Sequence, residues 1–181
     1  VGAGTFKPVK ASILQDHEMH QEWIDASLTF LKTWLDRINQ PLIGVGTTTL
    51  RTLESLYWLG LKIKLENPST MPTLQQWEPY QLAVNACTLE ESLISLINWM
   101  EKKELNRVVT QTALLIAPGY SIKTVCAILT NFHQPRSTLL LLIAALVGED
   151  WKKIYAHALE NNYRFLSYGD SSLLWKKEGD D

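Results

Sequence analysis

The chain has 181 residues, of which 46% are hydrophobic and 20% are charged, and its formal net charge at pH 7 is −2. This composition is typical of a globular protein with a sizeable core and excludes a disordered chain. The slightly negative charge argues against a strongly basic nucleic-acid module, although a local basic patch stays compatible with it.

The cysteines and the longest apolar run narrow the class of protein further. Cys87 and Cys126 both stand in apolar surroundings, which suits a reducing compartment and gives neither a disulfide framework nor a cysteine-rich metal site. The longest apolar run, residues 139–147, is too short to cross a bilayer, and no secretory signal is visible. We therefore predict a cytoplasmic protein without a membrane segment.

The first residues, Val1-Gly-Ala-Gly-Thr-Phe6, lack an initiator methionine and read as the end of a strand. We therefore expect a piece of a longer protein that has lost a partner segment upstream. If the next polar stretch, residues 16–22, is helical, His17 and His20 share a face and could hold a metal with Glu22 or Asp16. The spacing of the zinc-protease motif is absent, so we expect no metal and keep a polar approach to a helix as the alternative.

Hydrophobic periodicity predicts the elements that follow. Residues 26–38 have apolar side chains at helical spacing, residues 41–46 read as a short buried strand, and residues 47–58 read as a helix that Thr47 or Thr48 can cap. The turn between this strand and helix presents free backbone N–H groups, which suits a carboxylate or phosphate. It matches neither the dinucleotide-binding fingerprint nor the P-loop, so a routine turn stays the alternative.

Further along, residues 61–65 suggest another strand and residues 67–80 a loop. Thr88 and Glu91 form a capping box, which opens a helix that extends to Met100. Residues 107–117 are strand-like, residues 149–162 helical, and residues 163–174 a strand or a loop that leads to one. This alternation predicts an α/β fold with a mostly parallel sheet.

One stretch concentrates polar side chains between two apolar elements. A buried strand over residues 124–129 precedes Thr130, Asn131, His133, Gln134 and Arg136, and a helix over residues 137–147 follows and is closed by Gly148. Polar groups on a loop between rigid elements are typical of sites in α/β proteins. Asn, His and Pro are also ordinary loop residues, so a structural role is the alternative.

Several pieces, in one order along almost the whole chain, resemble a known family. They are Val1-Gly-Ala-Gly-Thr-Phe6 with Pro8-Val9, Asp16-His17, Met19-His20 and Glu22, Val45-Gly-Thr-Thr48 with Arg51-Thr-Leu-Glu-Ser55, Pro118-Gly-Tyr120, Leu129-Thr-Asn-Phe-His133 with Pro135 and Ser137-Thr-Leu-Leu140, and Tyr163-Arg-Phe165 with Ser167-Tyr-Gly-Asp170. In these pieces the chain resembles the C-terminal part of the S-adenosylmethionine:tRNA ribosyltransferase-isomerases of queuosine biosynthesis.

The resemblance implies that residues 1–181 form a single α/β domain, the second portion of a partial-barrel (TIM-like) domain in a longer two-domain enzyme. The upstream half and an antiparallel β-barrel domain would lie outside this sequence. The implied reaction moves the ribosyl part of S-adenosylmethionine onto 7-aminomethyl-7-deazaguanine at the tRNA wobble position, which gives epoxyqueuosine and releases adenine and methionine. S-adenosylmethionine is then a consumed substrate, tRNA and the missing half are partners, no metal is needed, and the isolated fragment is expected to be inactive.

The matched positions suggest roles for individual residues. His133 is the first candidate for acid–base work, His17 and His20 come next, and Asp170 or Glu22 would orient a histidine or hold ribose hydroxyls. The remaining predicted substrate-binding residues are Thr47, Thr48 and Arg51, for a carboxylate such as that of methionine; Arg136, for RNA phosphate; Phe132, Tyr163 and Tyr168, for stacking on a base; and Gly46, Glu54, Asn131 and Ser137.

Two departures from the family pattern leave other functions open. Gln134 stands where the family has a hydrophobic residue, and residues 56–117 form a longer segment in which residues 109–116 replace a Gly-Trp-Thr-Asp strand. One alternative is a divergent paralogue that acts on another nucleoside or S-adenosylmethionine-derived substrate. The other is a nucleoside-binding domain without catalysis.

Overall fold

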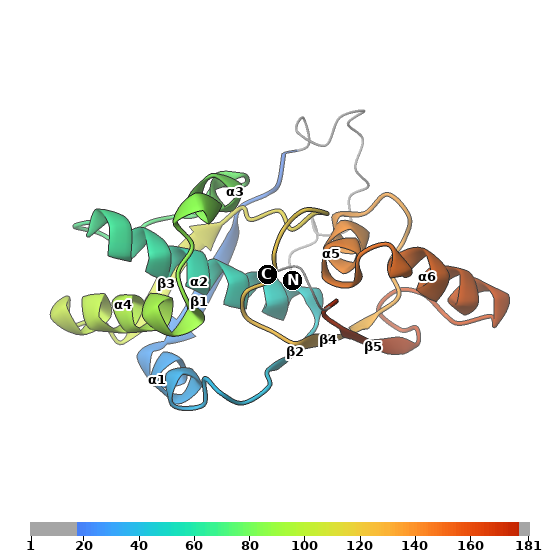
Figure 1. The fold of residues 1–181 in the computed structure, drawn as a ribbon, viewed down its shortest axis with the longest axis horizontal. Helices are drawn as coiled ribbons and strands as arrows, with labels where there is room; N and C mark the ends of the chain where they lie inside the picture. Colours follow the sequence, from blue (N-terminus) through green and yellow to red (C-terminus); the bar gives the residue numbers. More distant parts are fainter. Residues whose placement is uncertain (1–17, 178–181) are drawn as a thin grey trace. The chain divides into compact units, whose positions relative to one another are not determined.

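The computed structural model describes residues 18–177, whose contacts group into two compact units. Within that range, the first unit contains residues 18, 42–51 and 115–177, and the second contains residues 19–41 and 52–114. In chain order (Figure 1), the elements are β1 (Glu22–Ser27), α1 (Leu28–Asp36), β2 (Ile43–Val45), α2 (Thr47–Glu66), α3 (Glu78–Leu82), η3 (Ala83–Asn85), α4 (Leu89–Lys102), β3 (Arg107–Thr112), β4 (Ala127–Asn131), α5 (Thr138–Val147), α6 (Asp150–Glu160) and β5 (Ser171–Trp175).

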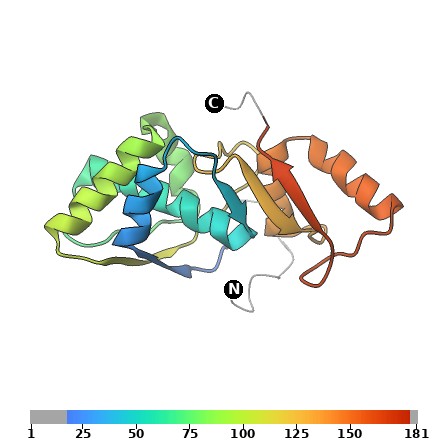
Figure 2. The same cartoon turned by 90° about the horizontal axis from the view of Figure 1, so that it is seen from below.

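The first unit is built on a three-stranded sheet in the order β2-β4-β5. β2 runs parallel to β4, with Val45 opposite Leu129, and β5 runs antiparallel to β4, with Leu173 opposite Leu129. Helix α5 covers one face of this sheet and contacts both β5 and α6 (Figure 2). Because most of its side chains are apolar, α5 is buried almost all round, and it forms the core of this unit together with the inward residues of the strands.

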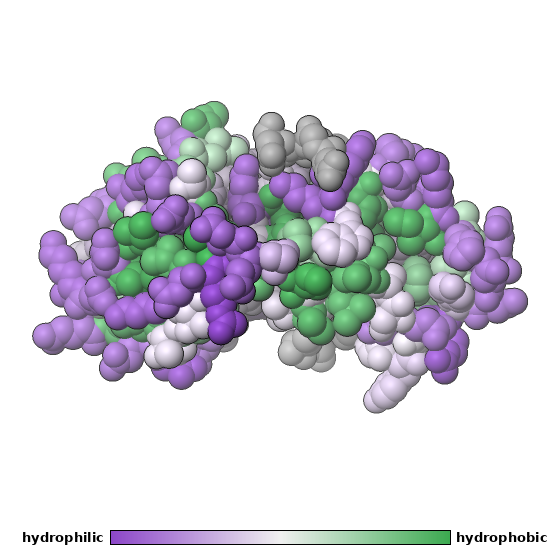
Figure 3. All heavy atoms as spheres, turned by 60° about the horizontal axis from the view of Figure 1, so that its bottom comes forward, coloured by the Kyte–Doolittle hydropathy of each residue, from purple (hydrophilic) through white to green (hydrophobic). Residues whose placement is uncertain are grey.

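The other face of this sheet is apolar and exposed. We call it the apolar sheet face; its members are between 40% and 66% exposed, and they are Ile43, Val45, Leu129, Leu173 and Trp175. These side chains are neighbours across the three strands, because Val45 pairs with Leu129 and Leu129 pairs with Leu173. Figure 3 shows a hydrophobic area over this part of the molecule. The solvated face of a sheet is normally polar, so a contiguous apolar face indicates an interaction surface.

The second unit contains an antiparallel pair of strands, β1 and β3, in which Ile24 faces Thr110. Helices α1 and α4 pack against each other, and α1 follows directly from β1 (Figure 2). Leu74 extends the pairing through a bridge to Thr112. Apolar side chains of these elements meet the portion of α2 that belongs to this unit, where Tyr57 and Leu59 are fully buried.

One predicted element was wrong: residues 61–65 are not a strand, because α2 continues through them to Glu66. Gly60 made the helix seem to end early, since glycine is unfavourable inside helices. Here its missing side chain allows close packing. A Cβ atom at Gly60 would lie 2.3 Å from the backbone oxygen of Ser92 in α4, and the Ser92 hydroxyl donates a 2.6 Å hydrogen bond to the Tyr57 carbonyl in α2. Gly60 thus allows α4 to pack closely against α2 and does not end the helix.

The α/β class is confirmed, but the sheet is not mostly parallel in the described residues. Among the strands there, only β2 and β4 pair in parallel, while β1–β3 and β4–β5 are antiparallel. The isolated bridge between Leu74 and Thr112 is also parallel. The chain returns after α6 through a tight loop to the edge of β4, and this return reverses the direction of β5. Of the local predictions, the capping box at Thr88 and Glu91 is confirmed by both of its hydrogen bonds, and β1 was not predicted as a strand. No helix within residues 18–177 is long and apolar enough to span a membrane.

Candidate functional site

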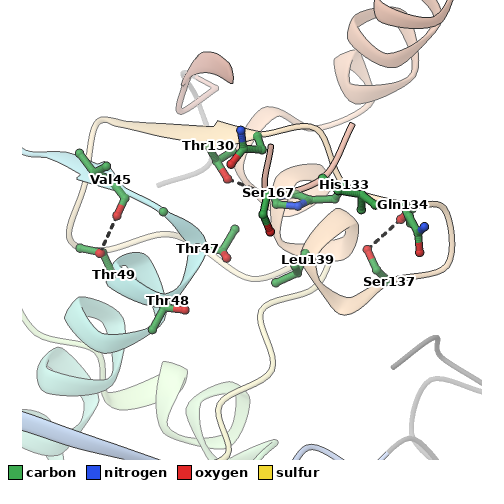
Figure 4. A pocket seen from close by; sticks show the side chains of 13 residues that line it. Val45, Thr47, Thr48, Thr49, Thr130, His133, Gln134, Ser137, Leu139 and Ser167 are labelled. Carbon is green, nitrogen blue, oxygen red and sulfur yellow. Dashed lines mark hydrogen bonds between the residues drawn. The ribbon is translucent and has the colours of Figure 1, made fainter. Parts of the chain in front are cut away.

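A cavity of about 360 Å³ opens in the first unit, where the parallel strands β2 and β4 end and the helices α2 and α5 begin (Figure 4). This is where open α/β sheets bind ligands. The lining residues come from three loops, and they are Val45, Gly46, Thr47, Thr48, Thr49, Thr130, Asn131, His133, Gln134, Ser137, Leu139, Leu166 and Ser167. Six of the predicted site residues are among them: Gly46, Thr47, Thr48, Asn131, His133 and Ser137.

The turn from β2 into α2 forms one wall. Gly46 has φ +87°, a left-handed conformation that favours glycine, and its N–H donates to the Leu129 carbonyl in β4 at 2.8 Å. The helix begins at Thr47, so Thr47 is its first residue rather than its cap, and Thr49 donates its hydroxyl to the Val45 carbonyl at 2.7 Å. The first backbone N–H groups of a helix have no partner within it, so this wall suits a partial negative charge.

The loop from β4 into α5 forms the opposite wall. Ser137 caps α5, as its Oγ accepts from the Leu140 N–H at 3.2 Å and donates to the Gln134 carbonyl at 2.8 Å. The backbone of Arg136 is left-handed, with φ 58°, and this conformation turns the chain sharply before the helix. The Arg136 side chain is exposed. A second helix N-terminus therefore borders the same cavity.

His133 is the most perturbed ionisable group of the cavity. Its imidazole is buried, Nε2 lies 3.1 Å from the Thr130 hydroxyl, and its backbone N–H donates to the Tyr155 hydroxyl at 3.0 Å. Burial lowers the pKa of His133 to about 4, because the interior disfavours the charged imidazolium. The ring is therefore neutral at physiological pH, able to donate or accept one hydrogen bond at each nitrogen.

The third wall is a loop between α6 and β5 that Asp170 holds in shape. The Asp170 carboxylate accepts from the Arg164 N–H at 2.7 Å and from its guanidinium at 2.8 Å. These hydrogen bonds and the charge of Arg164 lower the pKa of Asp170. Leu166 donates its N–H to the Phe132 carbonyl at 2.9 Å, and the Asn131 amide donates to the Gly169 and Asp170 carbonyls. Asp170 thus does not line the cavity; it fixes the loop that presents Leu166 and Ser167.

The aromatic residues predicted to stack on a base lie in different surroundings. Phe132 is buried among the rings of Tyr155, Tyr163 and Phe165, so its ring is part of the core and offers no free face to a base. Tyr163 is partly exposed, and Tyr168 is almost fully exposed. Of the three, Tyr168 has the accessibility that base stacking requires.

The other predicted site residues are not among those that line the cavity. Arg51 and Glu54 are buried in α2, one turn apart. His20 and Glu22 belong to the second unit, where His20 is exposed and Glu22 begins β1. His17 and the glycines of the first six residues lie outside the described range. Within residues 18–177, no group of three His, Cys, Asp or Glu side chains is arranged to hold a metal.

The sequence did not identify several residues that shape the site. Tyr155 was expected only as an inward residue of a helix, and nothing in the local sequence indicates its bond to His133. Thr130 and Gln134 stand in the polar stretch but were not selected as binding residues. Ser167 and Leu166 could have been found from the polar Ser-Tyr-Gly-Asp segment, because turns beside a strand end often carry site residues.

The described residues that line the cavity carry polar groups but no formal charge. The lining in the described part of the chain consists of hydroxyls, two side-chain amides, a neutral imidazole and aliphatic groups. Such a set of donors and acceptors fits a sugar or an uncharged heterocycle, and the two helix N-termini add a preference for partial negative charge.

Comparison with known proteins places this chain in a family. Residues 1–174 match the model of the family described as queuosine biosynthesis protein. The S-adenosylmethionine:tRNA ribosyltransferase-isomerases of Novosphingobium aromaticivorans and Rhizorhabdus wittichii are 38% and 37% identical over 96% of this chain, which spans 40% and 39% of their lengths. The solved structure of S-adenosylmethionine tRNA ribosyltransferase from Thermotoga maritima matches 84% of this chain and 40% of its own, with 29% identity and a TM-score of 0.51. The chain belongs to the queuosine biosynthesis protein family and spans about 40% of the length of the curated relatives it matches.

Proposed function

We propose that this chain carries the nucleoside-handling site of an enzyme that transfers and isomerises the ribosyl part of S-adenosylmethionine onto 7-aminomethyl-7-deazaguanine in tRNA. Epoxyqueuosine is the product, and adenine and methionine are released. The observation that carries the proposal is the convergence of two separate sequence motifs, 45–48 and 130–137, on one uncharged polar cavity in a member of this family.

The proposed chemistry needs a sugar held in a site from which water is largely excluded. The sulfonium of S-adenosylmethionine makes the neighbouring ribose C5′ protons acidic, so a base can remove one; the tRNA amine then attacks the sugar and adenine leaves. His133 is the proposed acid–base residue, because it is the ionisable side chain among the described residues that line the cavity. Thr47, Thr48 and Ser137 would hold polar groups of the substrate beside the two helix N-termini.

The larger substrate would approach over exposed residues at the cavity rim. Arg136 is exposed in the loop that precedes α5, where it is available to a phosphate of RNA. Tyr168 is exposed in the loop that also presents Ser167, and its ring is available to stack on a base. Arg51 and Glu54 are buried and would act by supporting the first turns of α2.

A chimera provides the test. This chain would replace the matching region of the Novosphingobium relative, and the product would be incubated with S-adenosylmethionine and tRNA carrying 7-aminomethyl-7-deazaguanine. We expect released adenine and modified nucleoside by mass spectrometry, and loss of both in His133→Ala with the fold retained. His157→Ala, which alters an exposed histidine of α6 outside the cavity, is the matched control. Full turnover in the His133→Ala chimera would refute the assignment.

A divergent paralogue is the second candidate, favoured by the departures at Gln134 and in residues 56–117. Gln134 lines the cavity, so a changed side chain there alters what the cavity accepts. Adenine release that does not depend on tRNA would favour this candidate over the first.

We further propose that the apolar sheet face is covered by the part of the longer protein that the relatives carry beyond the matched region, including the expected partial barrel. The support is the exposure of five apolar side chains on one regular face and the length of the relatives. Leu173→Asp should then lower the melting temperature of the chimera but leave that of the isolated chain nearly unchanged. Leu159→Asp, on exposed α6, should change neither. Equal effects of Leu173→Asp in both proteins would count against the proposal.

A further inference from the structure

Thr130 and His133 form a buried pair at the end of β4. The Thr130 hydroxyl lies 3.1 Å from Nε2 of His133, and both residues are less than a tenth exposed (Figure 4). At such burial water is not a ready substitute partner, so the hydroxyl and the ring nitrogen must satisfy each other.

The direction of this hydrogen bond follows from what else the hydroxyl can reach. Within residues 18–177, the Thr130 hydroxyl has no hydrogen-bond partner other than Nε2. If Nε2 carried the ring proton and donated it, the hydroxyl proton would be buried without an acceptor, and leaving a buried donor unsatisfied is unfavourable. If the hydroxyl donates to Nε2, every polar atom of the pair is satisfied. The second arrangement requires the ring proton to sit on Nδ1, since a neutral imidazole protonates one nitrogen only.

The other ring nitrogen faces the cavity. His133 is one of the lining residues, and its Nδ1 has no hydrogen-bond partner in the described part of the chain. Among the described residues, Nδ1 of His133 is also not one of the fully buried polar atoms that lack a hydrogen-bond partner. It is therefore the atom that a bound ligand can reach.

We infer that Thr130 is a positioning residue that holds His133 in the Nδ1–H tautomer, so that His133 presents a hydrogen-bond donor to the substrate. The inference rests on the proposed function only for the identity of that substrate. The substrate atom opposite Nδ1 is then an acceptor, such as a sugar oxygen or a purine ring nitrogen. A neutral imidazole in this state can polarise such an atom, as in enzymes that use a neutral histidine as an electrophile. Of the acid–base roles proposed for His133, this state assigns it that of the donor, so the group that removes a carbon-bound proton is a different one.

The test reads the tautomer directly and needs no substrate. The chain is labelled with ¹⁵N at histidine, and long-range ¹H–¹⁵N spectra are recorded at neutral pH, with His133→Gln used to assign the ring. We expect a pyrrole-type Nδ1 and a pyridine-type Nε2 for His133. Thr130→Val removes the donor, and the two nitrogen signals should move toward each other as both tautomers become populated.

Two further variants separate this effect from general loss of packing. Thr130→Ser keeps a hydroxyl and should restore the original pattern. Thr110→Val makes the same change at a buried strand threonine of the second unit, whose hydroxyl donates to the Pro72 carbonyl, and should leave the His133 signals unchanged. A pyrrole-type Nε2 in the wild-type chain would overturn the inference, and this spectrum decides even if Thr130→Val fails to fold. An inactive chimera with the expected tautomer would count against the proposed function alone.

Discussion

Acidification should destabilise the chain through His133. In the folded chain burial lowers the pKa of His133 from 6.5 to about 4, so between these values the folded ring is neutral while the unfolded ring is protonated. The unfolded state then binds more protons, and stability falls as the pH falls. The contribution of the neutral His133 ring to the free energy of unfolding is fully present above the unfolded pKa near 6.5, and it is lost as the pH drops toward about 4.

The magnitude follows from the size of the shift. A pKa difference of one unit corresponds to about 1.4 kcal/mol, so the two and a half units between 6.5 and about 4 correspond to roughly 3 kcal/mol in full. Between about pH 7 and pH 4.5, where most but not all of the effect is expressed, the loss should be roughly 2 kcal/mol.

The assay is urea unfolding at a series of pH values for the wild type and for His133→Gln. The carboxylates titrate in both proteins, so the difference between the two curves isolates the histidine. Wild type should lose about 2 kcal/mol more than the variant over this range. His157→Gln, which removes an exposed histidine of α6, should follow the wild type. Parallel stability curves for wild type and His133→Gln would show that folding does not lower the pKa of His133.

Three substitutions test the packing and the loops. Gly60→Ala should lower the free energy of unfolding, measured in urea, by about 1–2 kcal/mol. The added methyl group overpacks against Ser92, and this cost outweighs the gain of about 1 kcal/mol in helix propensity. An unchanged or higher stability would contradict the close packing of α2 and α4. Ser137→Ala should cost about 1 kcal/mol in the same assay through loss of the cap of α5, and Ser137→Thr, which keeps a capping hydroxyl, should recover most of it. Asp170→Asn should speed hydrogen exchange at the Leu166 and Gly169 amides, because Arg164 loses its charged partner; unaltered exchange there would mean that Asp170 does not hold the loop.

Local sequence was a reliable guide wherever an element is stabilised by its own residues. The predicted capping box of α4 is confirmed, because its two hydrogen bonds join residues three apart. Ser137 caps α5 at the same spacing, although no cap was predicted there. The short strand β2, the glycine turn at Gly46 and the return strand β5 were likewise readable from apolar runs and turn residues.

Sequence was misleading where a distant segment decides the outcome. Gly60 lies inside a helix because α4 approaches it, and no pattern near Gly60 reveals that approach. The alternating pattern of residues 22–27 was missed, since it becomes a strand by pairing with β3 more than eighty residues later. The predicted parallel sheet fails for the same reason: an apolar run indicates a strand but not the direction of its partner.

Residue type and spacing along the chain were sufficient to recognise the family, the capping box at Thr88, and the two motifs that supply Gly46, Thr47, Asn131, His133 and Ser137. Only the tertiary structure decided that these motifs meet in one cavity, that Asp170 shapes a loop instead of lining it, and that Tyr155 and Thr130 fix His133. The physical reason is that hydrogen bonds between near neighbours depend on residue type and spacing, which the sequence states. The burial and partners of a side chain depend on which distant segments pack around it, and burial is what makes the His133 ring neutral.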